Sequence, residues 1–157
     1  MKIDVTEVTE FIQAQGPQTR VYLGADSIRY RVHREWWAEY TVAVVVHRDS
    51  RHGCKIFGEI TQERDYDRRS DRPSLRLMNE VYKVSDMFQR LAPALSGRPV
   101  EIHLDINPSE MAGSHCVIQQ AIGYIRGTCN VIPMVKPAAF AASYAADRIA
   151  RYGTAGA

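Results

Sequence analysis

The sequence predicts one α/β domain on a mixed five-stranded sheet, in which an antiparallel three-strand meander is followed by alternating helices and strands. Three apolar or β-branched runs come first, and the short turn signal between the last two favours an antiparallel hairpin. After them, helical periodicity alternates with strand patterns, which favours right-handed crossovers and parallel strands. The expected strands cover residues 21–25, 40–46, 55–60, 100–104 and 129–135.

The N-terminal half begins with a short helix. Apolar residues recur at helical spacing within residues 4–15, and the pattern stops at a Gly-Pro pair. Residues 21–25 are apolar and lead directly into Asp26, which predicts a buried strand with an acid at its end. The runs 40–46 and 55–60 complete the expected meander.

A helix and a fourth strand follow. From Ser74, apolar residues fall on one helical face as far as the stop signal at Gly97, and Glu80 lies within this apolar stripe. Residues 100–104 form the next strand pattern, and Asp105 follows it directly. Two expected strands therefore end in an aspartate.

The C-terminal part repeats the alternation. The start signal at residues 107–109 and Gly127 bound a second helix. Pro133 in the strand 129–135 favours an edge position or an early end, because proline cannot donate to a ladder. A last helix is expected over residues 138–152.

Length and composition narrow the function classes. The chain has 157 residues, of which 45% are hydrophobic and 24% charged, and this disfavours intrinsic disorder. The net charge of +2 is too small for bulk electrostatics to indicate a nucleic-acid protein. Cys54, Cys116 and Cys129 form no C-x-x-C pair, so a reducing, cytoplasmic location fits best. No stretch approaches about eighteen apolar residues, which disfavours export and membrane spanning.

We expect three segments. Residues 1–19 form a leading helix and connection, residues 20–152 form the folded domain, and residues 153–157 form a flexible tail.

Four acidic residues stand out by position: Asp26, Glu80, Asp105 and Asp147. If the first and fourth strands are neighbours, Asp26 and Asp105 end close together, and Glu80 faces them from the helix packed on the sheet. Crowded carboxylates repel one another, and a pair of Mg²⁺ or Mn²⁺ ions is one common resolution. Two such ions can activate water against a phosphodiester.

Taken singly, three of these acids have plainer interpretations. Asp26 fits a turn residue, Glu80 fits a paired acid at the edge of the stripe, and Asp147 fits an ion pair with Arg151 one helical turn on. Both sets of interpretations remain open from the residues alone.

Four segments resemble the YkuK-like family of ribonuclease H-like domains over roughly residues 20–150. The most specific are the G-x-D-S start, which contains Asp26, and the K-P-x-x-x-A-x-x-x-A-D ending, which runs from Lys136 to Asp147. The resemblance implies a ribonuclease H-like fold with helices on both faces of the sheet. It also implies that Asp26, Glu80, Asp105 and Asp147 bind two Mg²⁺ or Mn²⁺ ions for nuclease or strand-transfer chemistry.

Two further residues, Lys136 and His103, could assist such a site, and a third, His115, has a different expectation. Lys136 follows the last strand and could neutralise a scissile phosphate, although a capping or solvent-facing lysine fits equally well. His103 shares a strand face with Asp105 and suits a proton-transfer group, but a lone strand histidine is more often a core residue. His115 lies on an apolar helix stripe and is expected to be structural.

Two arginine-rich segments have different expectations. Arg29, Arg31 and Arg34 alternate with aromatic residues, a composition that can contact phosphates and stack on bases, although a solvent-facing strand edge gives the same pattern. In residues 61–73, four arginines are matched by four acids, so this connection is expected to be a solvated surface.

The sequence therefore favours a metal-dependent nuclease with Asp26, Glu80, Asp105 and Asp147 as ligands and water as the nucleophile. Its partner would be RNA, DNA or a hybrid, and no membrane. The alternative is a catalytically inactive ribonuclease H-like module that binds nucleic acid or protein without divalent metal, with a salt dependence set by the arginines. An actin-like ATPase is disfavoured by length and by the lack of a phosphate-loop motif.

Overall fold

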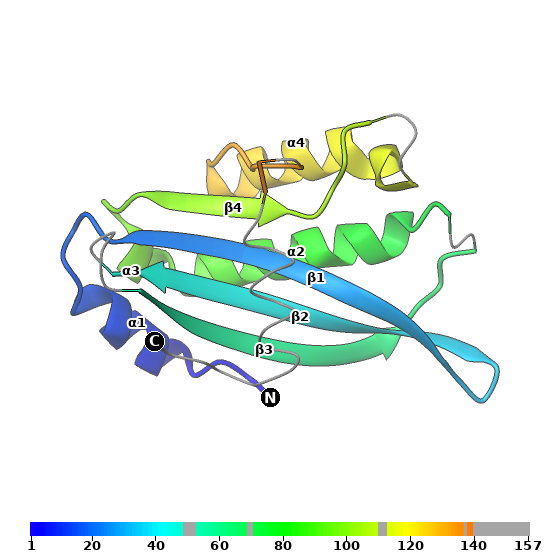
Figure 1. Ribbon diagram of the computed structural model, residues 1–157, viewed down its shortest axis with the longest axis horizontal. Coiled ribbons are helices and arrows are strands. Elements are labelled where there is room, and N and C mark those ends of the chain that lie inside the picture. The colour runs from blue at the N-terminus through cyan, green and yellow to red at the C-terminus, as the bar shows by residue number, and fades with distance from the viewer. Residues whose placement is uncertain (49–52, 69–70, 110–112, 137, 140–157) are drawn as a thin grey trace.

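The computed structural model describes residues 1–48, 53–68, 71–109, 113–136 and 138–139 (Figure 1). The elements follow in the order α1 (Val5–Gln13), β1 (Arg20–Val32), β2 (Glu35–His47), β3 (Cys54–Arg64), α2 (Ser74–Arg90), α3 (Ala92–Leu95), β4 (Val100–Leu104), the 3₁₀ helix η1 (Gly113–Val117) and α4 (Ile118–Cys129). Among these described residues, no helix is both long and apolar enough to cross a membrane.

The sheet is mixed, and its described part has four strands in the order β3-β2-β1-β4. The first three strands pair antiparallel as the expected meander, and β4 pairs parallel with β1. The β1–β4 register ends with Ala25 opposite Leu104. Asp26 and Asp105 are the next residues of the two segments, so they lie side by side where the β1–β4 pairing ends, as the sequence predicts. The expectation that the first strand ends before Asp26 is wrong, because β1 continues to Val32 and Asp26 still pairs with Thr41 of β2.

The first two strands are longer than the sequence pattern indicates. β1 continues beyond Ala25 to Val32, and β2 begins at Glu35, so the basic and aromatic stretch forms the tip of a long hairpin. The two residues of its turn, His33 and Arg34, have φ of 48° and 70°. Positive φ at both central positions is the requirement of a tight turn that preserves strand twist.

The core lies between one face of the sheet and the helices. Alternate β1 residues Val21, Leu23 and Ala25 are at most 2% exposed and belong to the same cluster as Val8 and Ile12 of α1. In Figure 1, α2 runs along β1 with α4 beside it, and α1 and α3 lie together at one end. The helix expected over 138–152 lies outside the described residues from 140 onward, so helices on the second face remain a prediction.

The expected fifth strand is reduced to one bridge in the described structure. α4 extends to Cys129 and ends at Asn130, whose φ of 54° is left-handed. Met134 then forms an isolated parallel bridge to His103, with hydrogen bonds from Met134 N to Ile102 O (2.8 Å) and from Leu104 N to Met134 O (2.9 Å). Lys136 N also donates to Ile106 O (3.0 Å), so the segment continues alongside the residues after β4.

Two helix boundaries also differ from the sequence pattern. The helix from Ser74 breaks at Leu91, since Pro93 cannot continue the hydrogen-bond ladder, and α3 follows as a single turn. The start signal at Asn107 is used differently, because the Asn107 side chain accepts from Ser109 N (2.9 Å) in a local turn. The regular helix α4 starts only at Ile118.

Candidate active site

Asp26 lies within β1, directly after its last pair with β4, and Asp105 directly follows β4, which pairs parallel with β1. Asp26 pairs in register with Thr41 of β2 and accepts a hydrogen bond from Ser27 N (2.8 Å). Asp105 follows β4, and its side chain is 20% exposed. The sheet topology thus brings together two acids that are 79 positions apart in the sequence.

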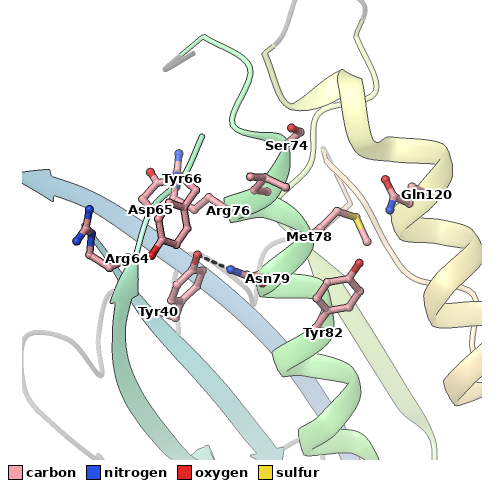
Figure 2. Close-up of a pocket in the computed structure, with 11 residues that line it drawn as sticks. Tyr40, Arg64, Asp65, Tyr66, Ser74, Arg76, Met78, Asn79, Tyr82 and Gln120 are labelled. Carbon is pink, nitrogen blue, oxygen red and sulfur yellow. Dashed lines mark hydrogen bonds between the residues drawn. The ribbon is translucent and has the colours of Figure 1, made fainter. Parts of the chain in front are cut away.

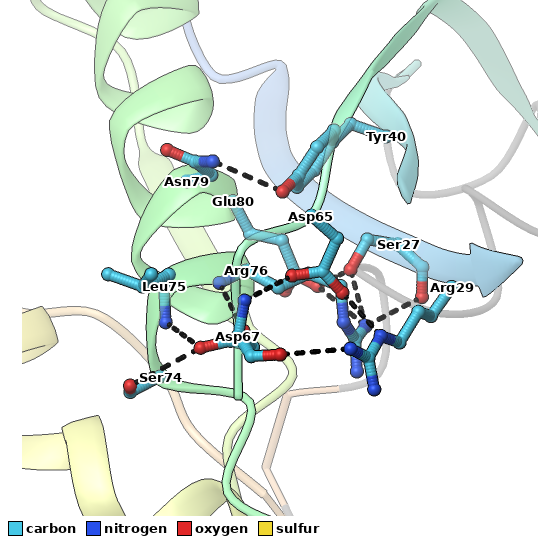
Figure 3. A network of polar contacts seen from close by, with 10 residues as sticks. All are labelled: Ser27, Arg29, Tyr40, Asp65, Asp67, Ser74, Leu75, Arg76, Asn79 and Glu80. Atoms are coloured by element: carbon cyan, nitrogen blue, oxygen red, sulfur yellow. Dashed lines mark hydrogen bonds and ion pairs between the residues drawn. The ribbon is translucent and has the colours of Figure 1, made fainter. Parts of the chain in front are cut away.

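Glu80 faces this edge from α2, and its burial is unusual for an acid. It is 4% exposed, and its carboxylate accepts a hydrogen bond from Ser27 Oγ (Figure 3). Burial raises the pKa of the Glu80 carboxyl well above its usual range. The hydrogen bond from Ser27 opposes this pKa shift, while the charge of Asp26 and, more weakly, of Asp105 adds to it. The three acids therefore act on one another electrostatically.

Arg76 joins Ser27 and Glu80 into one unit. Its Nη1 donates to Ser27 Oγ (2.6 Å) and Ser27 O (3.1 Å), and lies 4.0 Å from Glu80 Oε1. Arg76 and Glu80 are one helical turn apart, so α2 presents both to Ser27 in the middle of β1. Sequence reasoning missed Ser27 and Arg76 as partners of Glu80. The i,i+4 spacing of Arg76 and Glu80 was the available signal.

Lys136 supplies a second cation on the other side of the acids. Its Nζ lies 2.5 Å from Asp105 Oδ1. The hydrogen bond to Asp105 raises the pKa of Lys136, partial burial opposes the rise, and the charges of Asp26 and Glu80 contribute to it. Lys136 is therefore paired with Asp105, and its contact with a phosphate stays a prediction.

A buried polar network fixes the N-terminal end of α2 (Figure 3). Asp67 accepts hydrogen bonds from Leu75 N (2.8 Å) and Arg76 N (2.9 Å), so it caps a helix whose preceding residue is Pro73. Asp65 accepts from Asp67 N (2.9 Å). The expectation of a solvated connection is wrong here, because Asp65 and Asp67 are each only 7% exposed.

The three arginines expected to contact nucleic acid differ in their surroundings. Arg29 is 15% exposed, its Nε lies 2.6 Å from Asp65 Oδ2, and its Nη2 donates to Asp67 O (2.9 Å). Arg31 lies over the Trp36 ring, with 5.4 Å to the ring centroid, and Arg34 is exposed in the hairpin turn. Arg29 therefore has a structural role, and nucleic-acid contact by Arg29, Arg31 and Arg34 stays a prediction.

The two histidines lie apart from the acids' hydrogen bonds. His103 is fully buried; its Nε2 is 3.1 Å from Glu101 Oε2, and its ring packs edge-on against Tyr22. This setting agrees with a core residue. His115 lies half-buried in η1.

The donor set fits a hard divalent cation in its chemistry. Carboxylate oxygens are the ligands that Mg²⁺ and Mn²⁺ prefer, and a cation would relieve the cost of ionised Glu80 beside two other acids. In the described ranges, no three His, Cys, Asp or Glu side chains converge closely enough to hold an ion. Glu80 is turned to Ser27 and Arg76, and Asp105 to Lys136. Asp147 lies outside the described residues.

Comparison with known proteins agrees with this fold. A family model described as Ribonuclease H-like matches residues 4–151, nearly the whole chain. No curated protein and no solved structure matches the chain. The mixed sheet with an antiparallel meander and a parallel fourth strand is consistent with the family assignment. The chain belongs to the Ribonuclease H-like family.

Proposed function

We propose that this chain is a divalent-metal-dependent nuclease that hydrolyses phosphodiester bonds of RNA, DNA or a hybrid. Its metal ligands would be Asp26, Glu80, Asp105 and Asp147. The observation that carries the proposal is the placement of three acids: the β1–β4 register puts Asp26 beside Asp105, and Glu80 of α2 accepts a hydrogen bond from Ser27, the neighbour of Asp26. The family supports a nucleic-acid-related fold.

Each described residue has a distinct part in this proposal. Asp26 provides a carboxylate from within β1, Asp105 provides one from the residue after β4, and Glu80 provides a third from α2. Ser27 and Arg76 hold the Glu80 carboxylate in place. Lys136, 44% exposed beside Asp105, would attract the scissile phosphate. Two Mg²⁺ or Mn²⁺ ions, when bound, would supply an activated water and stabilise the leaving oxygen.

The test is cleavage of labelled single-stranded RNA, single-stranded DNA and an RNA–DNA hybrid with Mg²⁺, Mn²⁺ or EDTA. We expect cleavage with metal only, and its loss in Asp26→Asn and Asp105→Asn. Asp86→Asn is the matched control, because Asp86 lies on the same helix as Glu80 but its side chain is 66% exposed.

Cleavage that persists in Asp26→Asn, or that proceeds unchanged in EDTA, would overturn the proposal. Absence of cleavage of all three substrates, together with nucleic-acid binding that needs no metal, would favour an inactive binding module instead. We also propose a reducing, cytoplasmic setting, since Cys54, Cys116 and Cys129 are all free thiols.

A further inference from the structure

A cavity of about 340 Å³ opens between the end of β3, α2 and α4 (Figure 2). This volume is within the range of small-molecule sites, which is about 300–1,000 Å³. We call it the tyrosine pocket, after Tyr66 at the end of β3 and Tyr82 on α2. No residue named above as a metal ligand lines it.

The pocket combines exposed aromatic surface with a hydrogen-bonded floor. Tyr66 is 69% exposed, Leu75 54% and Tyr82 41%, so large apolar side chains face water on the pocket walls. Tyr40 lies deeper and is hydrogen-bonded by Asn79 Nδ2 to its hydroxyl (3.2 Å). Exposed tyrosines around a polar floor suit a flat, partly polar ring better than an aliphatic chain.

Several cations lie around this pocket. Arg64 lies at the wall with its guanidinium 5.6 Å from the Tyr66 ring centroid and its Nη1 2.9 Å from Glu35 Oε2, an exposed pair, and Arg76 of α2 also lines the pocket. Arg68 and Arg72 are exposed in the segment that joins β3 to α2. The sequence balances these arginines with acids, but Asp65 and Asp67 are turned inward and buried. The net charge that this segment presents to solvent is therefore more positive than the net charge of its sequence.

The pocket is continuous with the carboxylate site through one side chain. Arg76 lines the pocket and also donates to Ser27 beside Glu80. Asn79, on the pocket floor, precedes Glu80 in α2. A nucleic-acid strand with one phosphate at the carboxylate site would thus place its neighbouring nucleotide beside the pocket.

We propose that the tyrosine pocket binds an unpaired nucleobase of a single-stranded nucleic acid whose backbone runs past Arg76 to the carboxylate site. Tyr66 and Tyr82 stack on the base, and Arg64 and Arg72 attract the backbone. The substrate class is single-stranded, because a base within a duplex is already stacked. This inference rests on the proposed function, since it assumes that a nucleic acid reaches the acids.

The test is a binding measurement without catalysis. Fluorescence anisotropy in EDTA and low salt would compare a labelled oligothymidine with an abasic deoxyribose-phosphate chain of the same length. We expect the wild type to bind the base-bearing strand about 5- to 100-fold more tightly, the range for stacking of one base on aromatic side chains. The double variant Tyr66→Ala/Tyr82→Ala should bind both strands equally.

Three further variants separate the effects of the ring, of folding and of charge. Tyr66→Ala alone removes the most exposed ring and should lower the base preference without changing the thermal midpoint. Ile132→Ala removes an equally exposed apolar side chain, 72% exposed, beyond the C-terminal end of α4, and should change nothing. Arg72→Gln should weaken both strands together and reduce the salt slope by about 0.7, the value for one phosphate of a single strand.

The outcomes separate this inference from the nuclease proposal. Equal wild-type affinity for both strands, or a base preference that survives in the double variant, overturns the pocket as a base site while metal-dependent cleavage can still stand. No binding of either strand overturns it as well. A base preference lost in the double variant supports it even if cleavage is never found, because the assay contains no metal.

Discussion

Asp67, which caps α2, and Glu80, which lies on α2, are both buried, with 7% and 4% of their surfaces exposed. The surroundings of their carboxylates nevertheless differ. Asp67 accepts hydrogen bonds from two backbone N–H groups at the helix start, and Arg29 and Asp65 complete its network. Glu80 has Ser27 and Arg76 as partners, but burial raises its pKa well above the usual range, and the charges of Asp26 and Asp105 add to this rise. Buried charge that backbone N–H groups satisfy stabilises the fold, whereas buried charge beside like charge is the feature on which the metal-site proposal depends.

The largest expected effect comes from breaking the structural network. Arg29→Met leaves the Asp65 carboxylate, 1% exposed, without the guanidinium that lies 2.6 Å away. An uncompensated buried charge costs about 3–5 kcal/mol, roughly 6–20 °C in thermal midpoint for this length. Chemical and thermal unfolding would measure it.

The matching control removes both charges. Arg29→Met combined with Asp65→Leu should recover much of the lost free energy of unfolding, because no unpaired charge remains. If Arg29→Met alone leaves stability unchanged, Arg29 is not structural and the contrast between the two regions fails.

A smaller loss is expected from the helix cap itself. Asp67→Ala leaves the N–H groups of Leu75 and Arg76 without their acceptor. We expect a loss of about 2 kcal/mol in the free energy of unfolding, measured by denaturant titration. Asp86→Ala, on the solvent side of the same helix, is the control and should cost well under half as much.

Replacing Glu80 should change the free energy of unfolding in the opposite direction to replacing Asp67. Because its folded-state pKa is raised, its contribution to stability is fully present below the pKa of the unfolded chain and is lost as pH rises through the folded pKa. Glu80→Gln, compared with wild type in EDTA from acidic to neutral pH, should therefore gain relative stability as the pH rises. A Glu80→Gln variant that loses relative stability with rising pH would show that Glu80 is a satisfied structural acid like Asp67.

The sequence predicted the outline of the fold from local patterns. The β-branched run at 40–46 and the short turn after it led to the meander, and the acids directly after two strands led to the shared edge of Asp26 and Asp105. Local patterns do not show which charges of a balanced segment turn inward, so Asp65 and Asp67 were missed. They also do not show that the last expected strand pairs with β4 through a single bridge.

The smallest expected effect on stability comes from replacing Lys136, the lysine beside Asp105. Lys136→Met removes the ammonium group beside Asp105, and because Lys136 is 44% exposed the change in stability should stay within about 1 kcal/mol. Under the nuclease proposal the variant should bind Mn²⁺ more tightly, by up to about fivefold, since a competing cation is gone. Calorimetric titration of Mn²⁺ without nucleic acid would check this; weaker binding would contradict it.

The most direct test of the contrast is thermal unfolding with and without Mn²⁺ for wild type, Asp26→Asn and the control Asp86→Asn. At ten times the Kd, one bound ion stabilises the fold by about 1.4 kcal/mol, a shift of roughly 3–6 °C for a chain of this length. We predict this shift for wild type and Asp86→Asn and none for Asp26→Asn, which should also be more stable than wild type in EDTA because repulsion with Glu80 is relieved. Equal shifts in all three proteins, or no shift in any of them at several millimolar Mn²⁺, would contradict a metal site at these acids.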